Sequence, residues 1–215
     1  MHSETWLADT RTSYDTVADS YAEFVRHALA DHAYLLGSLA LFADLVRATG
    51  GGPVADVGCG PGNVTAHLAG LGVDAFGIDL SPAMIDLARR EHPHLRFEVG
   101  TMTELDLADD SVAGLLAFWS LIHIPDDLLP TVLAHFRRVV RPGGPLLVGF
   151  HVGDGTTLKT EGYGGHPMKL HVHRRRPDRV ADLLRDAGFA IEAQLALDPD
   201  TKSPGAIVFA RRPAR

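Results

Sequence analysis

A glycine-rich segment between an apolar stretch and a helical one constrains the fold of this chain more than any other feature. In residues 54–68, VADVGCGPGNVTAHL, glycine takes every second position of the turn, at Gly58, Gly60 and Gly62. Glycine loses more backbone freedom on folding than any other residue, so this spacing indicates a sharp turn or a ligand that approaches the backbone. A strand, a loop and a helix in this order are typical of α/β sheets, which bind ligands at that edge.

Segments with strand and helix patterns alternate through the centre of the chain. Apolar runs predict strands at 53–58, 73–80, 95–100, 111–119 and 145–151, and the segments between them predict helices at 62–70, 82–91 and 126–140. Ser81 and Pro82 are a good N-cap and first-turn residue for the second of these helices. Because the predicted strands are apolar on both faces, the pattern indicates a parallel sheet that is covered by helices.

The two ends of the chain depart from this alternation. Helical spacing of apolar residues at 13–30 and 31–48 predicts an N-terminal pair of helices. After a last helix at 177–189, strands at 190–197 and 205–212 follow one another without a helix between them, so they must be antiparallel neighbours. We therefore expect an α/β fold, a Rossmann-like doubly wound sheet that is mostly parallel, with a C-terminal antiparallel hairpin and an N-terminal helical cap.

A length of 215 residues predicts a single domain over 1–215. We expect its parts to be a helical cap at 1–50, a ligand-binding core at 51–152, an insert at 153–177 and a C-terminal helix and hairpin at 178–215.

Composition limits the partners and the compartment. The net charge of −7 argues against nucleic acid as the main partner, because phosphate binding needs a basic surface. Cys59 is the single cysteine, so no disulfide forms within the chain and a reducing compartment is favoured. No apolar run approaches the length of about 18 residues that spans a membrane, and the first residues lack a signal-peptide pattern. We expect a cytoplasmic protein, monomeric or homodimeric, that does not bind a membrane.

The spacing of the glycines bears on which ligand the loop binds. Dinucleotide-binding loops follow G-x-G-x-x-G, and here Asn63 stands at the third glycine position. The sequence instead resembles the class I S-adenosylmethionine-dependent methyltransferases, in particular their small-molecule, ubiquinone/menaquinone-type branch. The resemblance is carried in order by VADVGCGPG, GIDLS with SPAMIDLARR, VGTMTELDLADDSVAGLLAFWSLIHI and FRRVVRPGGPLLVGF. It covers residues 50–150 closely and the C-terminal helix and hairpin more loosely.

This resemblance implies S-adenosyl-L-methionine as cofactor and S-adenosyl-L-homocysteine as product. Gly58, Gly60 and Gly62 would lie against the methionine and ribose portions, and Asp79 would accept hydrogen bonds from both ribose hydroxyls. Thr101 stands where relatives often carry an acidic residue that binds the adenine. The remaining cofactor contacts that we expect are Tyr14, Asp56, Cys59, Leu80, Met84, Met102 and Phe118.

Several of these residues also have plainer interpretations. Met102 can be an ordinary core methionine, and Tyr14 and Tyr21 can simply pack the first helix against the domain. Cys59 has no evident partner base and is interpreted as a small loop residue rather than a nucleophile.

Methyl transfer to a hydroxyl, an amine or an acidic carbon benefits from a base near the cofactor. The loop after the fourth strand, FWSLIHIPDD, leaves the sheet at the cofactor edge and carries His123. We expect His123 to be the catalytic base, with a proton affinity near neutral pH, or to orient this loop. The residues that we expect at the acceptor are Tyr21, Trp119, His123, His151, His166 and His171.

The insert is rich in glycine and histidine, which suggests a mobile lid over the acceptor. His171 and His173 would share one face of a strand, but the insert lacks a closed set of ligands, so no metal is expected. Lys169 and 174–176 are interpreted as contacts to an anionic group or, more usually, as a solvated run of charge.

The favoured function is therefore a methyltransferase that acts on O, N or C of a small-molecule acceptor, in specialised metabolism. The alternative is a module that binds S-adenosylmethionine without catalysis. A nicotinamide oxidoreductase is disfavoured by Asn63 and by the terminal hairpin.

Overall fold

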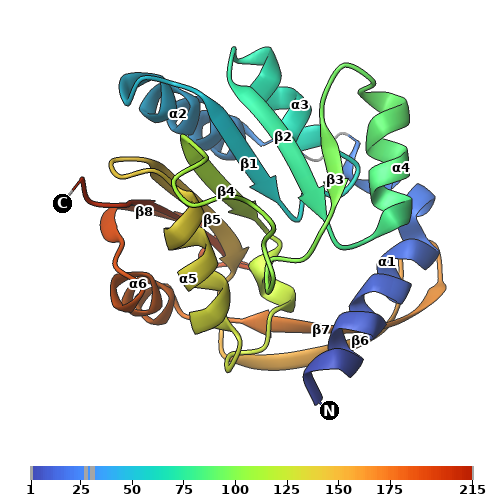
Figure 1. Cartoon of the computed structure of the whole chain (residues 1–215). Helices are drawn as coiled ribbons and strands as arrows, with labels where there is room; N and C mark the ends of the chain where they lie inside the picture. The colour runs from blue at the N-terminus through green and yellow to red at the C-terminus, as the bar shows by residue number, and fades with distance from the viewer. Residues whose placement is uncertain (1, 27–28, 30–31, 215) are drawn as a thin grey trace.

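The computed structural model describes the backbone of residues 2–26, 29 and 32–214, and side chains from residue 5 onward within those ranges. Its centre is a seven-stranded sheet in the order β3–β2–β1–β4–β5–β9–β8. The strands are β1 (Pro53–Val57), β2 (Asp74–Asp79), β3 (Phe97–Val99), β4 (Gly114–Phe118), β5 (Pro145–His151), β8 (Ala190–Leu197) and β9 (Gly205–Arg211). Strand β9 is antiparallel to β5 and β8, and the other pairs of the sheet are parallel. The predicted mostly parallel sheet with a C-terminal hairpin is confirmed (Figure 1).

Helices cover both faces of this sheet. They are α1 (His2–Val25), α2 (Ala33–Ala48), α3 (Asn63–Gly70), α4 (Pro82–Glu91), the short 3-10 helix η1 (Leu121–His123), α5 (Leu129–Val139) and α6 (Pro177–Asp186). Helices α2 and α3 bury one face of the sheet, and α5 and α6 bury the other. Neighbouring residues of β1 show the division, because Val54 packs in the first layer and Ala55 in the second. Within the described residues, no helix combines the length and apolar character that crossing a bilayer requires.

Helix α4 begins where the sequence indicated. The hydroxyl of Ser81 accepts a hydrogen bond from the N–H of Met84 at 3.1 Å, and Pro82 occupies the first turn. This cap satisfies one of the free N–H groups of the helix start. It fixes α4 directly after the end of β2, so that the helix leads away from the edge where the glycine loop lies.

Helix α1 starts earlier than the sequence indicated, at His2 rather than at residue 13, and it ends at Val25. Its first turns are mostly polar, so helical periodicity is weak there, and Trp6 supplies the contact with the core. The predicted second helix is confirmed as α2. Positions 27–28 and 30–31, at the predicted junction of the two helices, lie outside the described residues.

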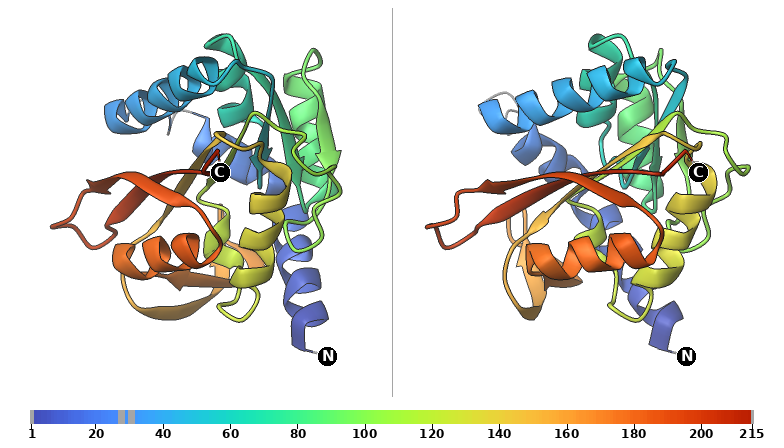
Figure 2. Two further views of the ribbon diagram at one scale, coloured as in Figure 1. Left: turned by 60° about the vertical axis from the view of Figure 1, so that its left-hand side comes forward. Right: turned by 90° about the vertical axis from the view of Figure 1, so that its left-hand side faces the viewer.

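The insert contains a regular element that the glycine content concealed. It forms an antiparallel hairpin of β6 (Gly155–Gly162) and β7 (His166–Arg174). Apolar residues of β7, Met168 and Leu170, pack on Val17 of α1. Figures 1 and 2 show the hairpin and α1 side by side, across the edge of the sheet toward which the arrowheads of β1 and β2 point. Together they cover the carboxyl ends of the parallel strands.

Candidate active site

Two of the three loop glycines make room for other parts of the protein. At Gly58 a Cβ atom would lie 2.2 Å from Cβ of Ser120, and at Gly62 it would lie 2.8 Å from Cζ of Phe97. Both residues also have positive φ values, +80° and +87°, which favour glycine. Gly58 therefore allows the loop after β4 to approach, and Gly62 allows α3 to pack beside β3.

Gly60 differs because the space beside it is open. Its φ is +54°, and the nearest atom to an added Cβ would be Cε1 of Tyr21 at 3.6 Å. The Gly60 N–H donates to Oδ2 of Asp79 at 2.8 Å, and the Ser81 N–H donates to Oδ1 at 2.9 Å. Asp79 thus ties the loop to the end of β2, and each oxygen keeps a lone pair for a further donor. Burial raises the pKa of Asp79, and these backbone bonds oppose the rise.

A cavity lies between the loop, the ends of β1, β2 and β4, and helix α1. About 690 Å³ of space in and at the mouth of this cavity is unfilled, and part of that space is open to solvent. Its walls combine backbone of the loop, one carboxylate and several apolar side chains. The lining residues are Trp6, Leu7, Thr10, Tyr14, Tyr21, Val57, Gly58, Gly60, Asp79, Leu80, Met84, Gly100, Thr101, Met102, Phe118, Trp119, Ser120, His123 and Ile124.

A second cavity adjoins the first, and the residues that line both form a boundary that we call the shared wall. The residues common to both cavities are Tyr14, Tyr21, Gly58, Gly60, Phe118, Trp119 and His123. Beyond this wall the second cavity is lined by residues of α1, the loop, β5 and the hairpin, among them Phe24, His151, Lys159, Tyr163 and Leu170. We call the first the loop cavity and the second the hairpin cavity.

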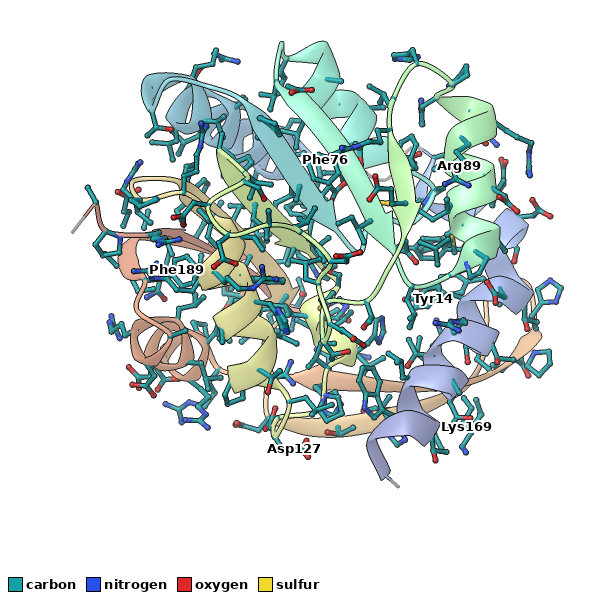
Figure 3. All side chains as sticks on the ribbon, in the orientation of Figure 1. Tyr14, Phe76, Arg89, Asp127, Lys169 and Phe189 are labelled. Atoms are coloured by element: carbon teal, nitrogen blue, oxygen red, sulfur yellow. The ribbon has the colours of Figure 1, made fainter. Side chains whose placement is uncertain are left out.

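Tyr14 and His123 form a hydrogen-bonded pair in the shared wall. The Tyr14 hydroxyl lies 2.7 Å from Nε2 of His123, and Nδ1 of the same ring lies 2.9 Å from the carbonyl of His171. Because a carbonyl only accepts, Nδ1 carries the proton, and Nε2 accepts the Tyr14 hydroxyl. Figure 3 shows Tyr14 on the side of α1 that faces the sheet. The hairpin thereby fixes the tautomer of a histidine that follows β4.

Burial changes the protonation expected of His123. Its side chain is buried, and burial lowers the pKa to about 4, although the bond to His171 raises it. The expectation of a proton affinity near neutral pH is therefore wrong, and the ring is neutral at physiological pH. Burial likewise raises the pKa of Tyr14 well above its usual value, so its hydroxyl stays protonated.

The end of β4 is held in a strained conformation. Trp119 has a φ of +55°, which is uncommon for a residue with a side chain. Its indole fits because Gly149 and Gly205 lack side chains, and a Cβ on Gly149 would lie 2.6 Å from the ring. The hydroxyl of Ser120 donates to the Val57 carbonyl at 2.7 Å. These contacts direct the chain after β4 into the shared wall.

Arg175 holds the loop after β4 in place through hydrogen bonds. The sequence placed it in a solvated run of charge, but its side chain is buried. Its guanidinium donates to Asp126 at 2.9 Å and to the Leu121 carbonyl at 3.0 Å, and it also donates to the Ile124 carbonyl. The interpretation as surface charge was wrong for this residue, because spacing alone does not show which arginine of a cluster points inward.

Replacing Arg175 by alanine is expected to lower the unfolding free energy by about 3 kcal/mol, because the buried carbonyls of Leu121 and Ile124 lose their donor. In a domain of this size that corresponds to a fall in Tm of roughly 6–12 °C. Arg176→Ala is the matched control, because Arg176 is exposed and forms an ion pair with Asp178 at the surface. Thermal unfolding followed by circular dichroism checks both variants. Equal Tm values for the two would contradict the support role of Arg175.

Most residues expected at the cofactor line the loop cavity. They are Tyr14, Gly58, Gly60, Asp79, Leu80, Met84, Thr101, Met102 and Phe118. Asp56 and Cys59 line the hairpin cavity instead. The Asp56 carboxylate accepts the Thr65 hydroxyl at 2.6 Å, and burial raises its pKa to about 7. Gly62 lines neither of these two cavities.

The residues expected at the acceptor are more dispersed. Tyr21, Trp119 and His123 lie in the shared wall, and His151 lines the hairpin cavity. His171 offers its carbonyl to His123, while its side chain lines a separate surface groove with Lys169. His166 is exposed at the tip of the hairpin.

Sequence reasoning missed Trp6, Leu7 and Thr10, which face the loop cavity from the first turns of α1. Their three- and four-residue spacing to Tyr14 was the available signal. It also missed Lys159 and Tyr163, because nothing in the insert's composition distinguished them. Among the described residues no group of His, Cys, Asp or Glu is arranged to hold a metal ion.

Comparisons with known proteins agree with this site. Residues 54–144 match a family model described as a methyltransferase domain. A curated relative, N-demethylindolmycin N-methyltransferase of Streptomyces griseus, is 32% identical over 146 residues, which is 64% of this chain and 61% of that protein. The chain thus spans less than two thirds of the length of this relative and of the next two curated relatives.

Solved structures share the fold. The CcbJ methyltransferase of Streptomyces caelestis superposes with a TM-score of 0.70 at 20% identity, covering 96% of this chain and 99% of that one. The 1,6-didemethyltoxoflavin-N1-methyltransferase of Burkholderia thailandensis, solved with 1,6-didemethyltoxoflavin and S-adenosylhomocysteine, has a TM-score of 0.63 at 24% identity. It covers 95% of this chain and 91% of its own. The matched domain at 54–144, the sheet order and the glycine loop together support a class I S-adenosylmethionine-dependent methyltransferase.

Proposed function

We propose that the protein transfers the methyl group of S-adenosylmethionine to O, N or C of a small-molecule acceptor. The observation that carries this proposal is the shared wall, because residues of the glycine loop and the hydrogen-bonded Tyr14–His123 pair line both cavities. A donor in the loop cavity and an acceptor in the hairpin cavity would meet at this wall. A module that only binds the cofactor has no need of the second cavity or of the pair.

The residues of the loop cavity fit the cofactor. Asp79 retains lone pairs for ribose hydroxyls, Gly60 leaves its backbone open to the cavity, and Met102 offers a polarizable apolar contact for adenine. Thr101 lines the same cavity, and its hydroxyl forms a hydrogen bond with that of Thr103 at 2.8 Å. When bound, the cofactor supplies a methyl group made electrophilic by a sulfonium, which needs no metal.

The protein's own contribution is to hold the acceptor and to receive its proton. Since the Tyr14 hydroxyl donates its proton to His123, its oxygen can accept a hydrogen bond from the O–H or N–H group of the methyl acceptor. As that proton moves to Tyr14 and the tyrosyl proton moves to Nε2 of His123, the electron pair stays on the acceptor atom. The resulting imidazolium would donate to the His171 carbonyl. The low pKa of His123 favours transfer late in the reaction, when the acceptor has become acidic.

The nature of the relatives supports a small-molecule acceptor. The names of the Streptomyces griseus and Burkholderia thailandensis enzymes describe N-methylation of indolmycin- and toxoflavin-type compounds. We extend this to a role in specialised metabolism, in the cytoplasm, as a monomer or homodimer that binds neither nucleic acid nor membrane. The division into a cap, a core, an insert used as a lid and a C-terminal part is retained as a proposal.

Calorimetric titration with S-adenosylmethionine tests the cofactor assignment. Asp79→Ala is expected to weaken binding by at least about tenfold, or 1.4 kcal/mol, because hydrogen bonds to a charged acceptor are lost. Asp79→Asn keeps one acceptor oxygen and is expected to lose less. Unchanged affinity in Asp79→Ala, or binding of NADH in place of S-adenosylmethionine, would overturn the assignment.

A further inference from the structure

Lys159 is the cation of the hairpin cavity. Among the residues that line this cavity it is the sole lysine or arginine. It lies on β6 opposite Leu170, with the side chain half-buried, whereas its neighbours on the strand are exposed. Its stem crosses Gly162, where a Cβ would lie 2.5 Å from Cε of the lysine. The absence of a side chain at Gly162 thus lets the ammonium turn toward the cavity.

Among the residues that the structure describes, the ammonium of Lys159 has an aromatic neighbour and no ion-pair partner. Its Nζ lies 3.8 Å from the centroid of the Tyr163 ring. Within the described ranges, no carboxylate forms an ion pair with it, whereas Lys169 of the same hairpin pairs with Asp9 at 2.8 Å. A half-buried ammonium favours an anion beside it, because burial penalises its charge. Burial indeed lowers the pKa of Lys159.

The other ionisable residues of the cavity do not supply that anion. Asp56 accepts the Thr65 hydroxyl at the opposite end of the loop, and burial raises its pKa to about 7. Burial lowers the pKa values of His123 and His151, and neither imidazole carries a negative charge in any case. Lys159 also contributes to the low pKa of His123, so its charge acts at the Tyr14–His123 pair.

Aromatic side chains surround the cation. Tyr163 contacts Tyr21 edge-on at 4.9 Å and Phe24 at 5.5 Å between ring centroids. Phe118 and Trp119, which also line the cavity, form a second edge-on pair with ring centroids 4.7 Å apart. Rings of this kind bind flat apolar groups, in offset or edge-on contact. The cavity therefore joins aromatic walls to a single positive charge.

The geometry points to an acceptor that combines a flat ring with a carboxylate, bound in the hairpin cavity with the carboxylate on Lys159 and the ring between the aromatic walls. This inference names the acceptor class and rests on the proposed function. An ammonium that pairs with a carboxylate makes a charge-assisted hydrogen bond, which selects acids over the corresponding neutral amides. With the carboxylate on Lys159, the atom of the ring system that accepts the methyl group would lie beside Tyr14.

Two probes of equal shape test the inference, 2-naphthoate and 2-naphthamide. Their binding is measured by ligand-observed NMR, with and without saturating S-adenosylhomocysteine. The wild-type protein is expected to bind 2-naphthoate at least about tenfold more tightly than 2-naphthamide. Lys159→Met is expected to abolish this preference with little effect on 2-naphthamide. Lys202→Met is the matched control, because Lys202 lies exposed in the turn before β9, and it should keep the preference.

Equal affinity of the wild-type protein for acid and amide would overturn the inference, and so would a preference that survives in Lys159→Met. Thermal unfolding of each variant, together with retained binding of 2-naphthamide, shows whether the cavity is intact. The proposed function fails separately. If the wild-type protein prefers 2-naphthoate but does not bind S-adenosylhomocysteine, the methyltransferase assignment alone is contradicted. If it binds S-adenosylhomocysteine but shows no preference for the acid, only the acceptor class is contradicted.

Discussion

Replacing Gly60 by valine is expected to abolish S-adenosylmethionine binding while the chain still folds. The Cβ would meet only Tyr21, at 3.6 Å, so the protein has room for it, but the branched side chain would occupy the space that both cavities share. We expect affinity to fall by at least about 100-fold, or 2.8 kcal/mol. The positive φ of +54° adds a strain of about 1–2 kcal/mol to the folded state.

A matched variant separates this strain from the loss of space. Gly72 has a φ of +81° with no atom within 4 Å of an added Cβ, and it lies in the turn between α3 and β2. Gly72→Val should therefore lose similar stability and keep full cofactor affinity. Calorimetry and thermal unfolding of both variants provide the comparison. Wild-type affinity in Gly60→Val would show that the ligand does not approach this loop.

Replacing His123 by alanine is expected to lower kcat by about 100-fold or more and to leave cofactor affinity nearly unchanged, because the proton acceptor is lost. Tyr14→Phe should have a similar effect on kcat, since it breaks the same hydrogen bond. The double variant should be little worse than either single one, because the two residues act as a unit. His94→Ala is the control, since His94 is exposed before β3.

The pH dependence distinguishes this pair from a free histidine. Only the neutral ring accepts the Tyr14 hydroxyl, so the rate should fall as pH drops through the pKa of about 4 and stay flat above it. An inflection near pH 6.5 that disappears in His123→Ala would contradict the buried pair. If His123 only positions the acceptor, His123→Ala should mainly raise KM, and His123→Asn should restore much of the activity.

The sheet was predictable from the sequence because its signals are local. Continuous apolar runs such as 145–151 mark strands that are buried on both faces, and the segments between them carry helix periodicity. Ser81 locates the start of α4 to within one residue. The terminal strands follow one another without a helix, which fixed their antiparallel pairing. These features depend on neighbours within a few residues along the chain.

The site was less predictable because its contacts join distant segments. The sequence singled out Tyr14, His123 and His171 separately, yet the hydrogen bonds that connect them span 109 and 48 positions. Burial then moved the pKa of His123, and no local pattern reports burial by a hairpin that is far away in the chain. In the insert, Lys159 turns inward because Gly162 has no side chain, and this is a consequence of the hairpin's geometry.

A crystal structure of the protein with S-adenosylhomocysteine tests the central claim most directly. The account predicts that the ribose hydroxyls lie within hydrogen-bonding distance of Asp79 and the methionine portion along Gly60. It predicts that the sulfur faces the wall formed by Tyr14, Tyr21 and His123. A ribose away from Asp79, or a sulfur turned from that wall so that no acceptor in the hairpin cavity could reach it, would contradict the account.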